Sequence, residues 1–273
     1  MTVHDLDKTF AGSIPEIYDA YLVPLIFEPY AIDLAARVTK QPPARLLELA
    51  AGTGAVTRRL ALELPASTEI VATDLNQPMI DRANAIGATR SIAWRQADAL
   101  KLPFADASFD CIVCQFGVMF FPDKPKAFAE ARRVLKPGGR LLFNTWDRLE
   151  TNEFTATVNT ALAEMFRDNT PSFMARVPHG YFDYDRIRRD LAAGGFRQPA
   201  TIEAVDAQSR AAAPRIPAVG FCQGTPIRNE IEARPGASLG AATDAAELAL
   251  SNRFGAGAIT GQIRAHVVSV TRE

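Results

Sequence analysis

The apolar and polar positions of residues 45–147 alternate between short hydrophobic runs and longer stretches with helical spacing. Short runs separated by helical stretches are typical of a parallel sheet that helices cover on both faces. The spacing predicts helices over residues 55–64, 78–86 and 125–135. It also predicts strands with the sequences RLLELA (45–50), EIVATD (69–74), SIAWRQAD (91–98), FDCIVCQ (109–115) and RLLFNTW (140–146).

The third of these helices runs into the sequence KPGG at residues 136–139. Proline cannot continue a helix, and consecutive glycines permit backbone conformations that other residues avoid. We therefore expect the chain to reverse sharply at KPGG and then to enter the strand over residues 140–146.

The pattern is looser on both sides of this core. Residues 14–38 look like helical pieces that Pro15, Pro24 and Pro29 punctuate, and they are rich in aromatic and aliphatic side chains. After residue 147 we expect helices over residues 153–166, 184–195, 214–235 and 241–254, and strands over 200–208 and 261–272.

We expect one domain over residues 1–273. Residues 1–40 would form an N-terminal helical cap, residues 41–147 the ligand-binding core, and residues 148–273 a substrate-lid insert with the final strands. The insert between the last two strands is about 50 residues long, and connections of that length commonly serve a binding site.

Charge and composition narrow the class of protein. Thirty Lys and Arg residues against 31 Asp and Glu residues give a net charge of -1, so no overall positive field would attract nucleic acid. No apolar stretch reaches the length that spans a bilayer, and the N-terminus lacks the basic start and apolar core of a secretory signal. We therefore expect a cytoplasmic protein without integral membrane association and without a nucleic-acid partner.

The cysteines predict neither a disulfide framework nor a metal centre. Three cysteines are too few for a secreted disulfide scaffold. Cys111 and Cys114 form a CxxC sequence inside a predicted strand, where residues three apart point to opposite faces. We interpret both as core residues, and no second Cys or His cluster completes a zinc site.

The sequence LELAAGTGAVT, residues 47–57, connects the first strand to the first helix through small residues. At such a turn the backbone can approach a ligand closely, and the start of the helix favours negative charge. Nucleotide-type ligands use this arrangement. Tight packing between the strand and the helix would require small residues as well, so the turn alone does not decide between the two.

Further strand ends favour a ligand site, because the carboxyl ends of parallel strands meet at one edge of a sheet. Asp74 ends the second strand, where an acidic side chain can accept hydrogen bonds from both ribose hydroxyls. Asp98 ends the third strand and could accept a hydrogen bond from an adenine amino group, with Leu75 and Ala99 as apolar contacts to the ring. Gln115 ends the fourth strand at the same edge.

The residues around the turn argue against two common phosphate-binding motifs. A nicotinamide dinucleotide motif has a third glycine where this chain has Thr57, and a P-loop has a lysine that does not follow this turn. Glu48 lies just before the turn, where an acid would be unfavourable beside a pyrophosphate. An acid at that place suits a ligand that carries an ammonium group and a positively charged sulfur.

Four sequence motifs follow one another along the chain: LLELAAGTGAVT, VATDLNQPMI, WRQADALKLPFADASFDCIV and EARRVLKPGGRLLF. In this order and spacing they resemble the motifs of class I S-adenosylmethionine-dependent methyltransferases, in particular those of the ubiquinone/menaquinone-biosynthesis type. The resemblance covers residues 40–147. It implies an α/β fold with a Rossmann-like, doubly wound, seven-stranded sheet, mostly parallel with an antiparallel last strand, and helical lid elements.

The resemblance also implies a cofactor and the residues that hold it. S-adenosyl-L-methionine would be the cofactor and S-adenosyl-L-homocysteine its product, with no metal. Asp74 would hold the ribose, Asp98 with Ala99 would receive the adenine, and Gln115 would face the sulfonium region. The family usually has glycine where this chain has Ala50. The methionine part would be lined by Glu48, Ala50, Gly52 and Gly54.

We predict an enzyme that transfers a methyl group to the O, N or C atom of a small-molecule acceptor. Two catalytic candidates lie outside the core: His179 as a general base, and Tyr18 as a lid residue that reaches the cofactor or the acceptor. One alternative is a protein that binds the cofactor without transferring methyl groups. Another is an NAD-dependent oxidoreductase, which Thr57 and Glu48 disfavour. The sequence leaves open which molecule is the acceptor and whether the protein is a homodimer.

Overall fold

The computed structural model describes residues 7, 10–234 and 236–273, so the predicted cap over residues 1–40 lies partly outside the described residues. The chain folds into two compact units, and each combines three stretches of sequence. The first unit comprises Met1–Phe27, Trp146–Gly180 and Asp206–Ala265, and the second comprises Glu28–Thr145, Tyr181–Val205 and His266–Glu273. The expected division into cap, core and lid insert stays a prediction.

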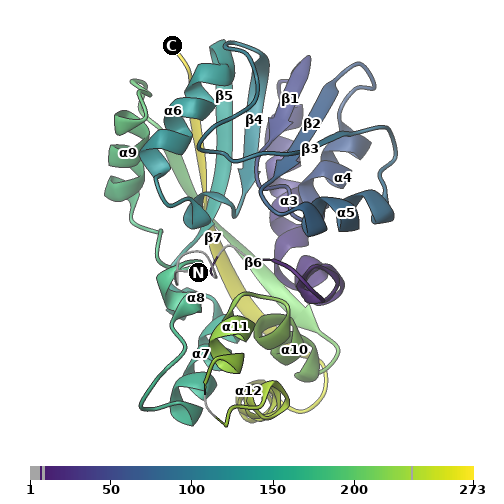
Figure 1. Cartoon of the computed structure of the whole chain (residues 1–273), viewed down its shortest axis with the longest axis vertical. Helices are drawn as coiled ribbons and strands as arrows, with labels where there is room; N and C mark the ends of the chain where they lie inside the picture. The colour runs from purple at the N-terminus through teal and green to yellow at the C-terminus, as the bar shows by residue number, and fades with distance from the viewer. Residues whose placement is uncertain (1–6, 8–9, 235) are drawn as a thin grey trace. The chain divides into compact units, whose positions relative to one another are not determined.

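Seven strands form one sheet in the order β3-β2-β1-β4-β5-β7-β6 (Figure 1). The neighbours from β3 to β5 pair in parallel, with Leu47 opposite Val71 of β2 and Ile112 of β4. The chain order reverses at β1, and ligands of open α/β sheets bind at the carboxyl ends of strands beside such a reversal. The strands are β1 (Arg45–Glu48), β2 (Glu69–Asp74), β3 (Ala93–Gln96), β4 (Phe109–Gln115), β5 (Leu135–Trp146), β6 (Thr201–Ala211) and β7 (Ile259–Thr271).

The last strand, β7, runs antiparallel to β5. The N–H of Gly138 donates to the carbonyl of Arg272 at 2.7 Å, and the N–H of Arg272 donates to the carbonyl of Gly139 at 2.8 Å. Beyond the other end of β5, the N–H of Asp147 donates to the carbonyl of Arg264 at 3.1 Å. Residue numbers therefore rise along one strand as they fall along its partner, which confirms the predicted antiparallel last strand.

Helices cover both faces of the sheet in the second unit. Leu142 of β5 packs into one core cluster with Leu34 and Leu60, whereas the next residue, Phe143, packs against Phe128 with ring centroids 5.4 Å apart. Adjacent residues of a strand point to opposite faces, so the helices of Leu34 and Leu60 cover one face and the helix of Phe128 covers the other. The doubly wound arrangement is confirmed. The helices are α3 (Glu28–Thr39), α4 (Ala55–Glu63), α5 (Gln77–Ile86), α6 (Lys124–Val134) and α9 (Tyr184–Ala193).

The expectation for KPGG is wrong. Strand β5 already begins at Leu135, so KPGG lies inside the strand and not before it. Phe109 pairs with Leu135, whereas Cys111 pairs with Arg140, and the residues between these two pairs bulge from β5. Gly138 within the bulge has a φ of +79°, which glycine adopts without a steric penalty. The glycines therefore shape an irregular strand instead of a reversal.

The first unit consists mainly of helices. The predicted helices over residues 153–166 and 241–254 are confirmed apart from their end residues. No helix in the described part of the chain is long and apolar enough to cross a membrane. The helices are α2 (Ile14–Ile17), the π-helix η1 (Tyr18–Phe27), the 3₁₀-helix η3 (Leu149–Thr151), α7 (Glu153–Met165), α8 (Phe173–Arg176), α10 (Arg215–Gln223), α11 (Ile227–Glu232) and α12 (Leu239–Phe254).

Two helix expectations in this unit are wrong. Pro24 does not interrupt the helical backbone, because it lies inside the π-helix, whose wider turn displaces the carbonyl that a proline ring would meet in an α-helix. The single helix expected over residues 214–235 is two helices, since Gly224 follows α10 and Pro226 precedes α11. Glycine readily ends a helix, and proline is tolerated at the start of the next one.

Leu60 and Leu62 of α4 provide a test of the packing on this face of the sheet. Leu60 is fully buried in the core, whereas Leu62 is 61% exposed. We predict that Leu60→Ala lowers the free energy of unfolding by about 3 kcal/mol, because the substitution removes buried methyl groups and leaves a cavity. Leu62→Ala, the matched control, should change it by less than about 0.5 kcal/mol. Urea unfolding followed by circular dichroism measures both losses, and equal losses would contradict the packing.

Candidate functional site

The turn between β1 and α4 has a left-handed backbone at three positions. The φ angle is +52° at Ala50, +57° at Gly52 and +84° at Gly54. Glycine enters this region freely, whereas an alanine there carries roughly 1 kcal/mol of strain. A Cβ atom on Gly54 would lie 2.8 Å from the ring of Trp94. The turn therefore requires small residues because of its backbone conformation and because of its neighbours.

Glu48 ends β1 with its carboxyl group buried beneath the turn. The hydroxyl of Thr57 donates a hydrogen bond to Oε2 of Glu48 at 2.6 Å. Burial raises the pKa of Glu48 to about 8, so the protonated, neutral form prevails near neutral pH. Thr57 occupies the position of the third glycine in dinucleotide motifs, and its hydroxyl supplies a contact that glycine could not make.

Asp74 connects the end of β2 to the turn. One carboxylate oxygen of Asp74 accepts the N–H of Gly52 at 2.9 Å, and the other accepts the N–H of Asn76 at 2.8 Å. Burial raises the pKa of Asp74, while these backbone hydrogen bonds oppose the rise. The side-chain Nδ2 of Asn76 also donates to Oδ1 at 3.4 Å, so it is Oδ2 that retains capacity for a ligand. The predicted site residues Gly52 and Asp74 are therefore in direct contact.

The end of β3 lies beside Asp74, because the N–H of Ala97 donates to the carbonyl of Asp74 at 3.0 Å. Asp98 follows and is exposed, and its Oδ1 accepts the N–H of the residue two positions on at 2.9 Å. Ala99 is half-buried in the same short turn, and Leu75 after β2 is 42% exposed. The residues predicted to contact adenine thus lie at neighbouring strand ends and are accessible to solvent.

The end of β4 packs against the glycine turn. Gln115 ends the strand as predicted, and the following residue, Phe116, has a left-handed φ of +51°. Oδ1 of Asn144, on β5, accepts the N–H of Phe116 at 2.8 Å and so fixes the backbone beside Gln115. A Cβ atom on Gly117 would lie 2.5 Å from the Cβ of Ala50. Sequence reasoning did not single out Asn144 or Gly117, although a polar residue within the apolar run LLFNTW was an available signal.

His179 and Tyr18 belong to the first unit, where ring contacts connect them. Tyr18 stacks on Phe27 with centroids 4.9 Å apart, Phe27 lies 6.0 Å from Trp146, and Trp146 lies 6.1 Å from His179. These four residues are termed the aromatic row. The row brings both catalytic candidates into one set of contacts, and Phe27 and Trp146 are members that sequence reasoning did not identify.

His179 is a buried, neutral imidazole. Its Nδ1 lies 2.8 Å from the carbonyl oxygen of Asp147, and a carbonyl can only accept, so Nδ1 carries the proton. Burial lowers the pKa of His179 to about 4. The lone pair is therefore on Nε2, where it can accept a proton from a reacting group.

Comparison with known protein families shows which family part of the second unit resembles. The family model described as a methyltransferase domain matches residues 47–143. Residues 47–143 are therefore similar to a methyltransferase domain. The match includes the turn, the strand ends and every predicted cofactor residue from Glu48 to Gln115, and it confirms the resemblance inferred from the four motifs.

Curated relatives align with part of the chain. The chain is 37% identical over 138 residues to the ubiquinone/menaquinone biosynthesis C-methyltransferase UbiE of Ectopseudomonas mendocina, covering 49% of this chain and 51% of that protein. It is 41% identical over 110 residues to the demethylmenaquinone methyltransferase of Deinococcus radiodurans, covering 40% of this chain and 45% of that protein. The chain thus spans about half the length of the curated relatives that it matches.

Solved structures share the fold over most of the chain. The YcgJ protein of Bacillus subtilis superposes with a TM-score of 0.55 at 19% identity, covering 90% of this chain and 99% of that chain. The phosphoethanolamine N-methyltransferase 2 of Haemonchus contortus, in complex with S-adenosyl-L-methionine, superposes with a TM-score of 0.61 at 17% identity. That match covers 100% of this chain and 60% of the other. At these identities the likeness establishes the fold.

The contact between Gly117 and Ala50 predicts a dependence between the ends of β4 and β1. We expect Gly117→Ala to lower the free energy of unfolding by about 2 kcal/mol, because the new methyl group overlaps the methyl group of Ala50 and the Sγ of Cys114. Ala50→Gly removes that neighbour, so the double variant should lose less than the sum of the single losses. Gly257, with nothing within 4 Å of an added Cβ, gives the control Gly257→Ala. Additive losses in guanidinium unfolding would contradict the contact.

Proposed function

We propose that the protein is an S-adenosyl-L-methionine-dependent methyltransferase that transfers a methyl group to an O, N or C atom of a small-molecule acceptor. The observation that carries this proposal is the hydrogen bond of 2.9 Å between the Gly52 N–H and the Asp74 carboxylate, inside the stretch that matches the methyltransferase model. This hydrogen bond joins the motif expected to hold the methionine part of the cofactor to the motif expected to hold its ribose. The names of the curated relatives, all methyltransferases, support the same activity.

The residues at the strand ends fit this cofactor better than a phosphate-bearing one. The N–H groups of Gly52 and Gly54 already donate within the protein, to Asp74 and to the carbonyl of Ala51 at 2.9 Å. A phosphate site would need such donors free, whereas ribose hydroxyls and an ammonium group need acceptors. We assign the ribose to Asp74, the adenine to Leu75, Asp98 and Ala99, and the remainder of the cofactor to Glu48, Ala50, Gly52, Gly54 and Gln115.

The electrostatic state of Glu48 supports the assignment to the methionine part. Burial disfavours the charged form of Glu48 and raises its pKa to about 8, although the charge of Arg58 opposes the rise. A bound ammonium or sulfonium group would favour its ionised form. The bound cofactor supplies an activated methyl group, so the protein has mainly to orient the two reactants and exclude water.

Tyr18 and His179, both of the first unit, stay the catalytic candidates. With a pKa of about 4, His179 is a weak base. A weak base suffices when methyl transfer itself makes the acceptor strongly acidic, so that the proton leaves to Nε2 after transfer. Relatives named for ubiquinone and menaquinone biosynthesis support an acceptor with a ring.

Two measurements test the proposed function. Calorimetric titration should show binding of S-adenosyl-L-homocysteine and none of NADH, and the reverse result would overturn the proposal. Methyl-labelled donor is then incubated with pools of phenols, quinols, amines and phosphorylated amines, and labelled products are identified by mass spectrometry. We expect transfer to ring-bearing acceptors. Cofactor binding without transfer to any pool would make the chain a binding protein.

Proton release tests the role of Glu48. Because Glu48 is protonated at about pH 7 and a cationic ligand favours its ionised form, binding of S-adenosyl-L-methionine should release close to one proton. The release should vanish above about pH 9, where Glu48 is already ionised without ligand. Calorimetry in buffers of different ionisation enthalpy measures the protons released. Glu48→Gln should abolish the buffer dependence, and its persistence in this variant would reject the assignment.

Asp74→Ala tests the ribose contact. We predict that this substitution weakens cofactor binding by about 1 to 3 kcal/mol, because it strands the groups that hydrogen-bond to a charged acceptor. Asp81 is exposed on the neighbouring helix α5 and bonds Gln77 at 2.8 Å, so Asp81→Ala is the matched control with unchanged affinity expected. If calorimetry gave the two variants equal affinities for the cofactor, Asp74 would not be a ribose contact.

A further inference from the structure

A charged pair on α6 lies apart from the residues assigned to the cofactor. Glu130 and Arg133 are one helical turn apart in the fourth motif. Nε of Arg133 donates to one carboxylate oxygen of Glu130 and Nη2 donates to the other, each at 2.8 Å. Such a bidentate pair holds both side chains in one plane and so fixes where their remaining polar atoms point.

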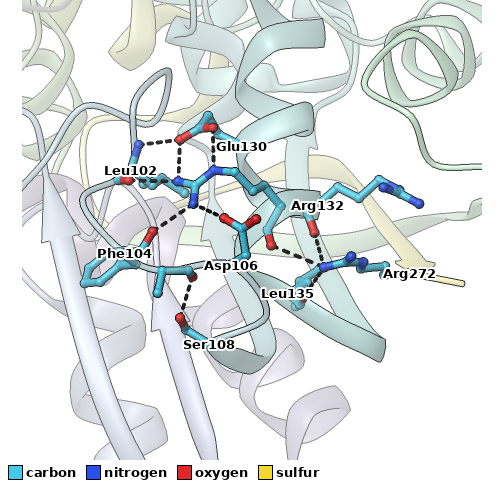
Figure 2. A network of polar contacts seen from close by, with 10 residues as sticks. Leu102, Phe104, Asp106, Ser108, Glu130, Arg132, Leu135 and Arg272 are labelled. Atoms are coloured by element: carbon cyan, nitrogen blue, oxygen red, sulfur yellow. Dashed lines mark hydrogen bonds and ion pairs between the residues drawn. The ribbon is translucent and has the colours of Figure 1, made fainter.

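The pair binds the main chain of the segment that follows β3. Oε2 of Glu130 accepts the N–H of Leu102 at 2.8 Å, and Arg133 donates to the carbonyls of Leu102 at 2.9 Å and Phe104 at 2.8 Å. Arg133 also donates to Asp106 at 2.8 Å. Figure 2 shows Leu102, Phe104, Asp106 and Glu130 converging on one guanidinium group. Both polar groups of the Leu102 main chain are therefore held by two side chains of α6.

Leu102 is close in sequence to the turn assigned to adenine. Oδ1 of Asp98 accepts the N–H of Leu100 at 2.9 Å, which makes the turn tight. The start of the turn is held by the hydrogen bond of 3.0 Å from Ala97 to the carbonyl of Asp74. Among the described residues, no hydrogen bond reaches Oδ2 of Asp98. A turn anchored at both ends keeps that oxygen in one place.

The ionic state of the pair supports its hold on the segment. Hydrogen bonding to Arg133 lowers the pKa of Glu130, and hydrogen bonding to Glu130 raises the pKa of Arg133. Both residues are therefore charged throughout the neutral range. Because their side chains are 20% and 31% exposed, solvent partly screens the attraction between them. Its main effect is local, on the position of the segment that it binds.

We propose that Glu130 and Arg133 are positioning residues that hold the Asp98 turn where it recognises the adenine base. This inference rests on the proposed function, because it takes Asp98 as the acceptor of the adenine amino group. A hypoxanthine base has a carbonyl oxygen where adenine has its amino group, and the carboxylate of Asp98 would repel that oxygen. The preference for adenine over hypoxanthine then depends on how firmly the turn is held.

The experiment compares S-adenosyl-L-homocysteine with S-inosyl-L-homocysteine by calorimetry. Arg133→Gln should weaken binding of the adenosyl compound about tenfold, roughly the loss of one hydrogen bond, and should leave binding of the inosyl compound nearly unchanged. The ratio of the two affinities is the informative quantity, since a general loss of structure would weaken both compounds alike. Arg133→Lys retains the positive charge, but a lysine cannot donate to Glu130 and to two carbonyl oxygens at once as the guanidinium group does. The ratio of adenosyl to inosyl affinity should therefore lie between those of wild type and Arg133→Gln.

Arg132 provides the matched control on the same helix. Its side chain pairs with Glu273 at 2.9 Å and takes no part in binding the segment after β3 among the described residues. Arg132→Gln should retain the wild-type ratio. An unchanged ratio in Arg133→Gln, or an equal change in Arg132→Gln, would overturn the inference while leaving the proposed function intact. If the wild-type protein binds neither compound, the proposed function fails, and the positioning role fails with it.

Discussion

The hydrogen bond from the Gly52 N–H to the carboxylate of Asp74 is the constraint from which the rest of the site follows. The parallel pairing of β1 and β2 brings the turn after one strand level with the acid at the end of the other, and the N–H of Ala51 bonds the carbonyl of Thr73 at 2.9 Å. The turn can make these contacts only with a left-handed backbone. That backbone conformation, together with close neighbours, is what restricts the turn to small residues.

The site built on this contact consists of acceptors more than donors. The N–H groups of Ala51, Gly52 and Gly54 are used internally, while the carboxyl groups of Glu48 and Asp74 are buried at the ends of adjacent strands. The positive charge of Arg58 is close enough to Glu48 to oppose the rise in its pKa, and the carboxyl groups offer acceptors to hydroxyl and ammonium groups. The same sheet edge that binds pyrophosphates in dinucleotide proteins thus suits an adenosyl amino acid here. Thr57 contributes to this difference through its bond to Glu48.

Much of the second unit could be predicted because its elements are fixed by local pattern. The strands from β1 to β4 and the helices α4 to α6 follow from buried apolar runs and helical spacing, and only their ends differ. The KPGG bulge could not be predicted, since the same glycines are compatible with a reversal or with a strand irregularity, and the pairing with β4 decides between them.

The places of some candidate residues could be predicted, because they lie at the ends of strands. Asp74 ends β2 and Asp98 follows β3 closely, while their roles toward a cofactor stay predictions. The roles of Asn144 and Gly117 could not be predicted, because they depend on which strands are neighbours in the sheet. The sequence alone does not give that strand order. Two helices of the first unit, α7 and α12, were predicted correctly apart from their ends. The continuous helix through Pro24 and the break at Gly224 were not predicted, because tertiary packing overrides such weak local signals.

A crystal structure of the chain soaked with S-adenosyl-L-homocysteine tests the central claim most directly. The account predicts ligand density along the carboxyl ends of β1 to β4, with the ribose hydroxyls bonded to Asp74, the adenine beside Asp98 and the amino acid part against the glycine turn. Density elsewhere, or a turn whose own atoms fill that space after soaking, would contradict the account.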